Sequence, residues 1–151
     1  MKPSPVFSSL AQAREGLLKL RASGVTTPSR GMSLHQALLH CTQSIDYSLS
    51  GFPVMKPKLV RITVGRLAVR HFLAQGSMRH KLHAPVPGAP AIPVEGELSR
   101  AWELLLAALD KFEQHHGALH DHFIFGTLTK EEFSRLHAMH LADHLSAFPA
   151  G

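Results

Sequence analysis

Three histidines near the C-terminal end of the chain could take part in holding a metal ion. His137, His140 and His144 lie within residues 129–148, which have the periodicity of a single helix. At about 100° per residue, the three imidazoles share the apolar side of that helix. His140 and His144 are one turn apart, so both rings can reach one point in space, as two ligands of one ion do. The pair predicts a divalent metal site that needs a further ligand from elsewhere.

The same pattern has an interpretation that requires no metal. A histidine on the apolar side of a helix is commonly a buried polar group that a neighbouring hydroxyl or carbonyl satisfies. The pair also differs from the HExxH motif of zinc proteases, because Leu141 stands where that motif has glutamate. The spacing alone therefore leaves metal ligation and hydrogen-bonded core histidines both open.

The composition favours one helical domain over residues 1–151. Hydrophobic residues make up 44% of the chain and aromatic residues 7%, and this length is enough for one real core. The single cysteine, Cys41, excludes an internal disulfide framework and favours a reducing compartment. We find no secretory signal in residues 1–30, and no apolar run near the roughly 20 residues that span a bilayer. We therefore expect a soluble cytoplasmic protein that does not enter a membrane.

The net charge of +5 is divided unevenly along the chain. Residues 1–94 hold 12 lysines and arginines against two acids, whereas residues 95–151 hold four against nine. A basic half could bind nucleic acid or another anion. However, its basic residues are spread along the sequence, and no aromatic residues interleave them as a stacking platform would require. We favour charge complementarity between packed halves over nucleic-acid binding.

A helix from Ser33 to Gly51 offers the third ligand. Ser33 and Gln36 have the spacing of a capping box, and Gly51 can end the helix. His40 lies near the edge of its apolar stripe and is the best candidate to join the C-terminal pair. Cys41 lies within the stripe, which favours a buried structural thiol over a nucleophile.

Three other segments have helical periodicity, namely residues 6–23, 57–75 and 95–116. Within residues 58–64, valine, isoleucine and threonine make a strand the competing interpretation. A second capping box, Thr129 with Glu132, opens the last helix. Within residues 57–75, we expect Leu59, Ile62, Val69 and Phe72 to face the core.

The remaining candidate residues lie in irregular segments or on the last helix. Residues 76–94 contain four prolines and must be irregular, either a lid that offers His80, Lys81 and His83 as ligand contacts or a solvated connector. His122, in the loop 117–128, is a candidate acid–base group at a pocket mouth or a neighbour of the metal ligands, with loop packing as its alternative. Asp143 could orient a ligand histidine, but its helical phase favours a solvated carboxylate.

These elements predict an all-α, antiparallel four-helix bundle with an additional N-terminal helix and a long proline-rich loop. Two motifs then resemble the DinB-like superfamily. Residues 33–40, SLHQALLH, resemble its S-x-x-x-x-L-x-H signature, and residues 140–144, HLADH, resemble its H-x-x-x-H on the last helix. The tail from His122 to Phe133, HFIFGTLTKEEF, is similar to an uncharacterised branch of that superfamily, a domain of unknown function. The resemblance covers most of residues 31–148.

The resemblance implies one divalent ion held by His40, His140 and His144 with an open coordination position, often in a homodimer. Imidazole suits Zn, Ni, Fe and Cu, and among these we expect Zn or Ni. Characterised relatives include transferases and isomerases that use mycothiol or bacillithiol, and an ion of this kind can activate a bound water or thiol. One departure is that relatives usually follow the last ligand with Arg and Gln, where this chain has Ser146 and Ala147. Two hypotheses result. A metal-dependent hydrolase or thiol transferase predicts an open position under a lid formed by residues 76–94, whereas a non-catalytic metal-binding or stress-associated protein predicts a closed four-coordinate site.

Overall fold

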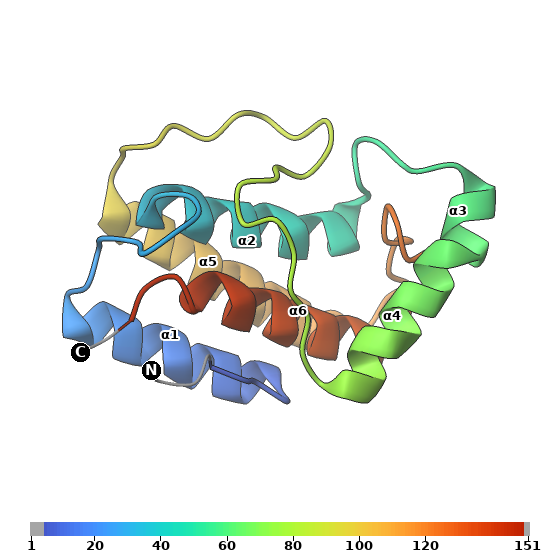
Figure 1. Ribbon diagram of the computed structural model, residues 1–151, viewed down its shortest axis with the longest axis horizontal. Coiled ribbons are helices and arrows are strands. Elements are labelled where there is room, and N and C mark those ends of the chain that lie inside the picture. Colours follow the sequence, from blue (N-terminus) through green and yellow to red (C-terminus); the bar gives the residue numbers. More distant parts are fainter. Residues whose placement is uncertain (1–4, 150–151) are drawn as a thin grey trace.

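The computed structural model describes residues 5–149 as an all-helical chain (Figure 1). Within those residues there is no strand, and the β-type pairing consists of an isolated bridge between His122 and Gly126. The all-α expectation is therefore confirmed. None of the helices in this part of the chain is both long and apolar enough to cross a membrane. The helices are α1 (Leu10–Ser23), α2 (Leu34–Ser50), α3 (Lys58–Ile62), α4 (Val64–Gln75), α5 (Leu98–Gln114) and α6 (Lys130–Leu145).

Both predicted capping boxes are present and set the starts of α2 and α6. The Ser33 hydroxyl accepts a hydrogen bond from the Gln36 amide at 3.1 Å, and the Gln36 side chain accepts one from the Ser33 amide at 3.1 Å. Thr129 and Glu132 make the same reciprocal pair. Each cap satisfies amide groups that the first turn leaves without helical partners. The two helices that carry the candidate ligands therefore start where local sequence places them.

Four long helices lie side by side and enclose the core (Figure 1). Helix α2 packs against α5 and α6, and α1 packs against the other side of α6. Helix α1, expected as an addition to the bundle, thus contributes to the core, where Ala13 and Leu17 are completely buried. Fully burying one large apolar side chain contributes about 1.5–3 kcal/mol. The largest of these buried side chains include Phe112, Phe133, Leu17, Ile45, Leu105 and Leu109.

The segment 57–75 is two helices rather than the single helix or the strand considered from the sequence. The chain bends at Thr63 (φ −114°, ψ −96°), between α3 and α4. At Gly65 a Cβ atom would lie 1.9 Å from the Ile124 carbonyl oxygen, so only glycine allows the loop before α6 to approach α4 this closely. This close contact holds α4 beneath the loop that carries His122.

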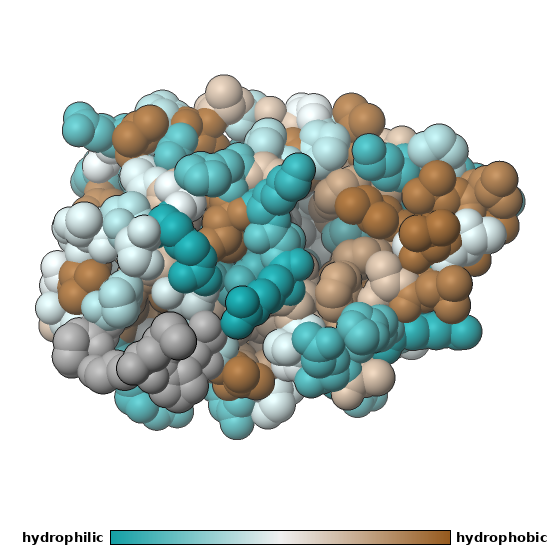
Figure 2. All heavy atoms as spheres, viewed as in Figure 1, coloured by the Kyte–Doolittle hydropathy of each residue, from teal (hydrophilic) through white to brown (hydrophobic). Residues whose placement is uncertain are grey.

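The expected inward orientation of Leu59 and Ile62 is wrong. Their side chains are 69% and 60% exposed, because α3 extends from one end of the molecule without a helix over its outer side. Figure 2 shows hydrophobic side chains gathered at that end. Val69 on α4 is completely buried and Phe72 packs against the core, as predicted.

The segment 76–94 is irregular, as its prolines predict, and passes across α6 and α2 before α5 begins (Figure 1). Its second half is fastened to α2 by polar side chains that donate to backbone carbonyls. Ser33 donates to Val94, Gln36 donates to Ile92, and Gln43 donates to Pro90. The first half crosses the face of the bundle where His140 and His144 lie.

Candidate metal centre

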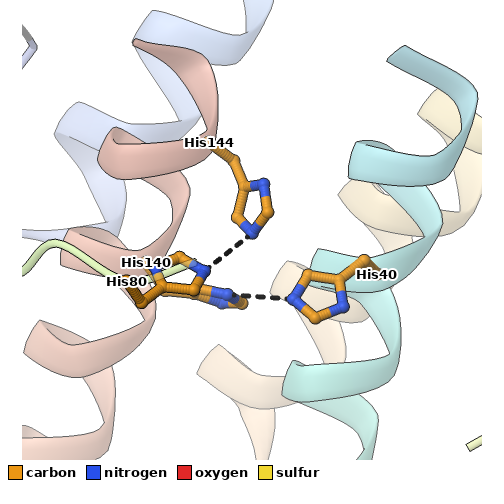
Figure 3. A group of neighbouring side chains, drawn as sticks. All are labelled: His40, His80, His140 and His144. Carbon is orange, nitrogen blue, oxygen red and sulfur yellow. Dashed lines mark hydrogen bonds between the residues drawn. The ribbon is translucent and has the colours of Figure 1, made fainter. Parts of the chain in front are cut away.

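Four histidines converge between α2 and α6 (Figure 3). His40 comes from α2, His140 and His144 come from successive turns of α6, and His80 comes from the irregular segment. One nitrogen atom from each ring lies within 4.8 Å of the other three. The structure thus brings together the three histidines proposed from sequence and adds a fourth. We refer to these four residues as the histidine cluster.

The spacing of the nitrogen atoms suits a divalent cation. Nε2 of His40 lies 3.2 Å from Nε2 of His140, and Nε2 of His80 lies 3.1 Å from Nε2 of His144. Four nitrogens bound tetrahedrally at about 2.1 Å from zinc would lie about 3.4 Å apart. Both pairs are close to that spacing, and imidazole is a preferred ligand of Zn and Ni. The four nitrogens could therefore hold a divalent cation, with the widest separation among them 4.8 Å or less.

Helix packing brings His40 to the pair on α6. Because α2 packs directly against α6, the His40 ring centroid lies 5.0 Å from that of His140 and 4.8 Å from that of His144. His40 and His144 are buried, with 4% and 2% of their surfaces exposed. Nδ1 of His40 is also buried and has no hydrogen-bond partner among residues 5–149. An unpaired buried polar atom destabilises a fold, so the cluster is a poor arrangement for stability alone.

The buried histidines of the cluster are held in the neutral form. Burial, followed by the proximity of His80, lowers the pKa of His40 to about 4. Burial also lowers the pKa of His144 to about 2, with the neighbouring His40 and His80 adding to the effect, and lowers the pKa of His140 well below its ordinary value. A neutral imidazole keeps a nitrogen lone pair, which metal ligation requires. At neutral pH these three rings can therefore accept a cation.

Asp143 holds His80 in the cluster, and the expectation of a solvated carboxylate at this position is wrong. Asp143 is only 9% exposed, and its Oδ2 atom accepts a hydrogen bond from the His80 backbone amide at 3.0 Å. The same oxygen lies 2.6 Å from Nδ1 of His80, which is an ion-pair distance without the geometry of a hydrogen bond. A carboxylate beside Nδ1 favours the tautomer with its proton there, which leaves the Nε2 lone pair directed at the cluster. A carboxylate close to the second ring nitrogen is common at histidines that ligate metals.

From the sequence alone, His80 is only one of three possible ligand contacts in its segment, together with Lys81 and His83. The structure separates these neighbours, because His80 points into the cluster whereas Lys81 and His83 are exposed. The contact that selects His80 joins residues 63 positions apart in the chain. The signal available in the sequence was a histidine in a long irregular segment, which is not enough to name a ligand.

A cavity of about 480 Å³ opens directly beside the cluster. His40, His80 and His140 line it, whereas His144 lies on the inner side of the cluster, facing the core. A volume of this size is typical of a small-molecule site. Most of the remaining lining is apolar and includes Phe52, Phe72, Met78, Val86, Phe123, Ile124, Phe125 and Leu136.

His122 also lines this cavity, but its ring supports the loop before α6. Its Nδ1 atom accepts hydrogen bonds from the backbone amides of Ile124 and Phe125, both at 3.2 Å. The ring stacks on that of Phe125, with centroids 4.4 Å apart and planes at 12°. Burial, followed by the proximity of His137, lowers the pKa of His122 to about 3. These contacts match the packing alternative, and a catalytic role for His122 stays a prediction.

His137 and Cys41, two other candidate site residues, have surroundings that favour structural roles. Nε2 of His137 lies 3.1 Å from the Ser48 hydroxyl, so this third histidine of α6 has a protein partner outside the cluster. Cys41 is buried, as predicted, and burial raises the pKa of its thiol far above the ordinary value. A thiol that stays protonated is a weak nucleophile.

Comparison with known proteins assigns the chain to a family. Neither the curated proteins nor the solved structures include a chain that matches this one. The model of the family described as "Protein of unknown function (DUF1569)" matches residues 2–150, which is nearly the whole chain. The protein that carries this four-histidine cluster therefore belongs to the DUF1569 family.

Proposed function

We propose that this protein is a metal-dependent enzyme with a DinB-like four-helix bundle. The four helices of the bundle are α1, α2, α5 and α6, which pack side by side around the core. The bundle places His40 on one helix and the pair His140 and His144 on the facing helix, which is how helical bundles build metal sites. The superfamily assignment is supported by the SLHQALLH and HLADH motifs, whose histidines all enter the cluster.

One observation carries the proposal of catalysis: the cluster forms part of the wall of a cavity large enough for a small molecule. When bound there, a divalent ion such as Zn or Ni would supply a positive charge that acidifies an adjacent water or thiol. The protein's own residues would exclude bulk water through the aromatic walls and orient the substrate against His40 and His140. The reaction class that fits is hydrolysis or thiol transfer on a small substrate with a substantial apolar part.

The fourth histidine favours a second candidate function. Four imidazoles complete a tetrahedral set around zinc, and closed sites of this kind are structural or serve metal binding rather than catalysis. In that case the protein is a non-catalytic metal-binding or stress-associated bundle, and His80 blocks the approach from the cavity. The homodimer and the cytoplasmic location remain predictions from the sequence under either function.

Metal content of the purified protein tests the metal centre. We expect close to one equivalent of Zn or Ni by elemental analysis, and its loss in a His140→Ala/His144→Ala variant. The matched control is His71→Ala/His116→Ala, which removes two exposed histidines and should retain the metal. Absence of metal from the wild-type protein, even after incubation with excess ion, would reduce the cluster to buried polar side chains.

Activity separates the two candidate functions once the metal is established. Metal-loaded protein is assayed against panels of small esters, amides and thiol cofactors with electrophilic acceptors. The enzyme hypothesis expects turnover that is lost in the His140→Ala/His144→Ala variant and retained in the control. Full metal occupancy without turnover of any panel member would favour the non-catalytic function.

A further inference from the structure

We propose that the cavity binds a small apolar molecule carrying one anionic group, and that this group takes the place of His80 at the histidine cluster. The inference rests on the metal centre proposed above and adds to it a ligand class and an exchangeable ligand. The inference rests on the position of His80. Its ring belongs to the cluster and also lines the cavity, and it is the only one of the four rings that comes from a segment without regular structure.

The four histidines differ in how firmly the fold holds them. His40, His140 and His144 are fixed by α2 and α6, whose backbones are hydrogen-bonded throughout and packed against each other. His80 lies in residues 78–89, which have no regular structure. In this stretch, every hydrogen bond that reaches a helix involves His80, through Asp143 or His144. Displacing His80 therefore releases the polar attachment of one short segment and leaves the bundle intact.

The buried apolar side chains of the same segment limit how far it can move. Leu82 is 7% exposed and Val86 is 4% exposed, and Val86 lines the cavity beside Phe52 and Phe123. Residues 90–94 are fastened to α2 by hydrogen bonds. Hence we expect the exchange to swing residues 78–81 outward while residues 82–94 stay in place.

The charges around the cavity select an anion. Lys56, Arg79 and Lys81 contribute to the lining and are exposed, and no acidic side chain in the described part of the chain lines the cavity. A divalent ion in the cluster would add further positive charge at the inner end. The exposed cations attract an anionic molecule toward the cavity and the ion would hold its anionic group, whereas the apolar part of the lining accommodates a hydrocarbon body. Neutral and cationic molecules of the same size lack the group that replaces an imidazole.

Competition between His80 and the incoming group predicts how a His80→Ala variant behaves. If the ring occupies its place about nine times in ten, removing it raises the apparent affinity for the ligand about tenfold. The variant keeps three helix-borne imidazoles, so it should still bind metal. His83→Ala is the matched control, because His83 lies three residues away in the same segment and is exposed.

The experiment uses cobalt(II), whose visible absorption reports the number and type of its ligands. Cobalt-loaded wild-type protein is titrated with hexanoate, 1-hexanol and hexylamine. We expect hexanoate to change the cobalt spectrum until the site is saturated. Hexanoate should also accelerate tryptic cleavage after Arg79 and Lys81, because the backbone of residues 78–81 becomes accessible to the protease when it moves outward with His80. The alcohol and the amine should leave the spectrum unchanged. In His80→Ala the spectrum without ligand should already differ from wild type, and hexanoate should bind about tenfold more tightly, whereas His83→Ala should match wild type.

The outcomes distinguish this inference from the function on which it rests. Failure of the wild-type protein to take up cobalt would overturn the metal centre itself. Cobalt uptake with identical spectra for wild type and His80→Ala would show that His80 is not a ligand and would overturn the inference alone. Cobalt uptake without a response to hexanoate, or with an equal response to hexylamine, would overturn the proposed ligand class and leave the metal centre standing.

Discussion

Two adjacent turns of α6 use buried histidines in different ways. His137, near the middle of the helix, lies against the rings of Phe112 and Phe133, with centroids 5.0 and 5.5 Å from its own. Its Nε2 atom is 3.1 Å from the Ser48 hydroxyl, which donates its own proton to the Ile45 carbonyl. His137 therefore donates to an oxygen atom, as a satisfied polar group in a core does.

On the next two turns, the imidazoles of His140 and His144 face those of other histidines. Nε2 of His140 has the Nε2 atom of His40 as its neighbour, and Nε2 of His144 has that of His80. A neutral imidazole has one donor and one acceptor nitrogen, so several rings that meet at one point compete for protons. A cation accepts all of the lone pairs at once. Burial and helical phase therefore do not distinguish a hydrogen-bonded core histidine from a candidate metal ligand, whereas the atom opposite the ring nitrogen does.

The largest effect that would test this contrast is stabilisation by metal. An ion that binds only the folded state at about a thousandfold excess over its dissociation constant adds about 4 kcal/mol to the free energy of unfolding. We expect Zn or Ni to stabilise the wild-type protein and a His137→Phe variant on this scale, measured by urea unfolding with metal or with a chelator. The His140→Ala/His144→Ala variant should show no such gain. Equal stabilisation of that variant would mean that the ion binds elsewhere.

A smaller effect should follow from Asp143, which connects the helix to the segment that carries His80. Replacing a carboxylate that supports a ligand histidine typically lowers metal affinity by about 10- to 100-fold. We expect Asp143→Asn to do so, measured by calorimetric titration of the metal-free protein. In a His80→Ala background the same substitution should have little further effect, because Asp143 is expected to influence the metal only through the His80 ring. Full additivity in the double variant would show that Asp143 acts independently of His80.

The smallest effect at a single step is the loss of stability that His137 should cause when the pH falls by one unit. Burial lowers its pKa from 6.5 to about 3, so between these values the unfolded chain binds a proton that the folded protein does not. The free energy of unfolding should therefore fall with decreasing pH by about 1.4 kcal/mol per unit from this residue. The contribution is complete above pH 6.5. It has been lost once the pH reaches about 3.

His137→Phe should make this slope shallower by that amount in urea unfolding of the metal-free protein. The substitution leaves the Ser48 hydroxyl with its bond to Ile45, so no buried donor is stranded. The four histidines of the cluster are present in both proteins, and His137 is only the last of the causes that lower the pKa of His140, so most of their contribution cancels in the difference. An unchanged slope would mean that His137 binds its proton equally in the folded and unfolded states.

The helices that carry the candidate ligands could be read from the sequence because local contacts define them. The capping boxes at Ser33 and Thr129 span three residues each, and the i, i+4 spacing of His140 and His144 follows from the helical repeat alone. The position of His40 near an apolar stripe was enough to nominate it as the third residue of the cluster. Burial of Cys41 and irregularity in residues 76–94 follow from equally local properties.

Contacts between distant segments decided the rest. The break at Thr63 and the exposure of Leu59 and Ile62 depend on how α3 extends past the bundle, which no local pattern encodes. His80 enters the cluster because its backbone amide donates a hydrogen bond to the carboxylate of Asp143, which lies 63 residues away in the sequence. Asp143 is itself buried at this contact. Helical periodicity and capping act over about four residues. An irregular segment takes its place only from the surface on which it packs, so the fourth histidine and the cavity beside it emerged only in the tertiary structure.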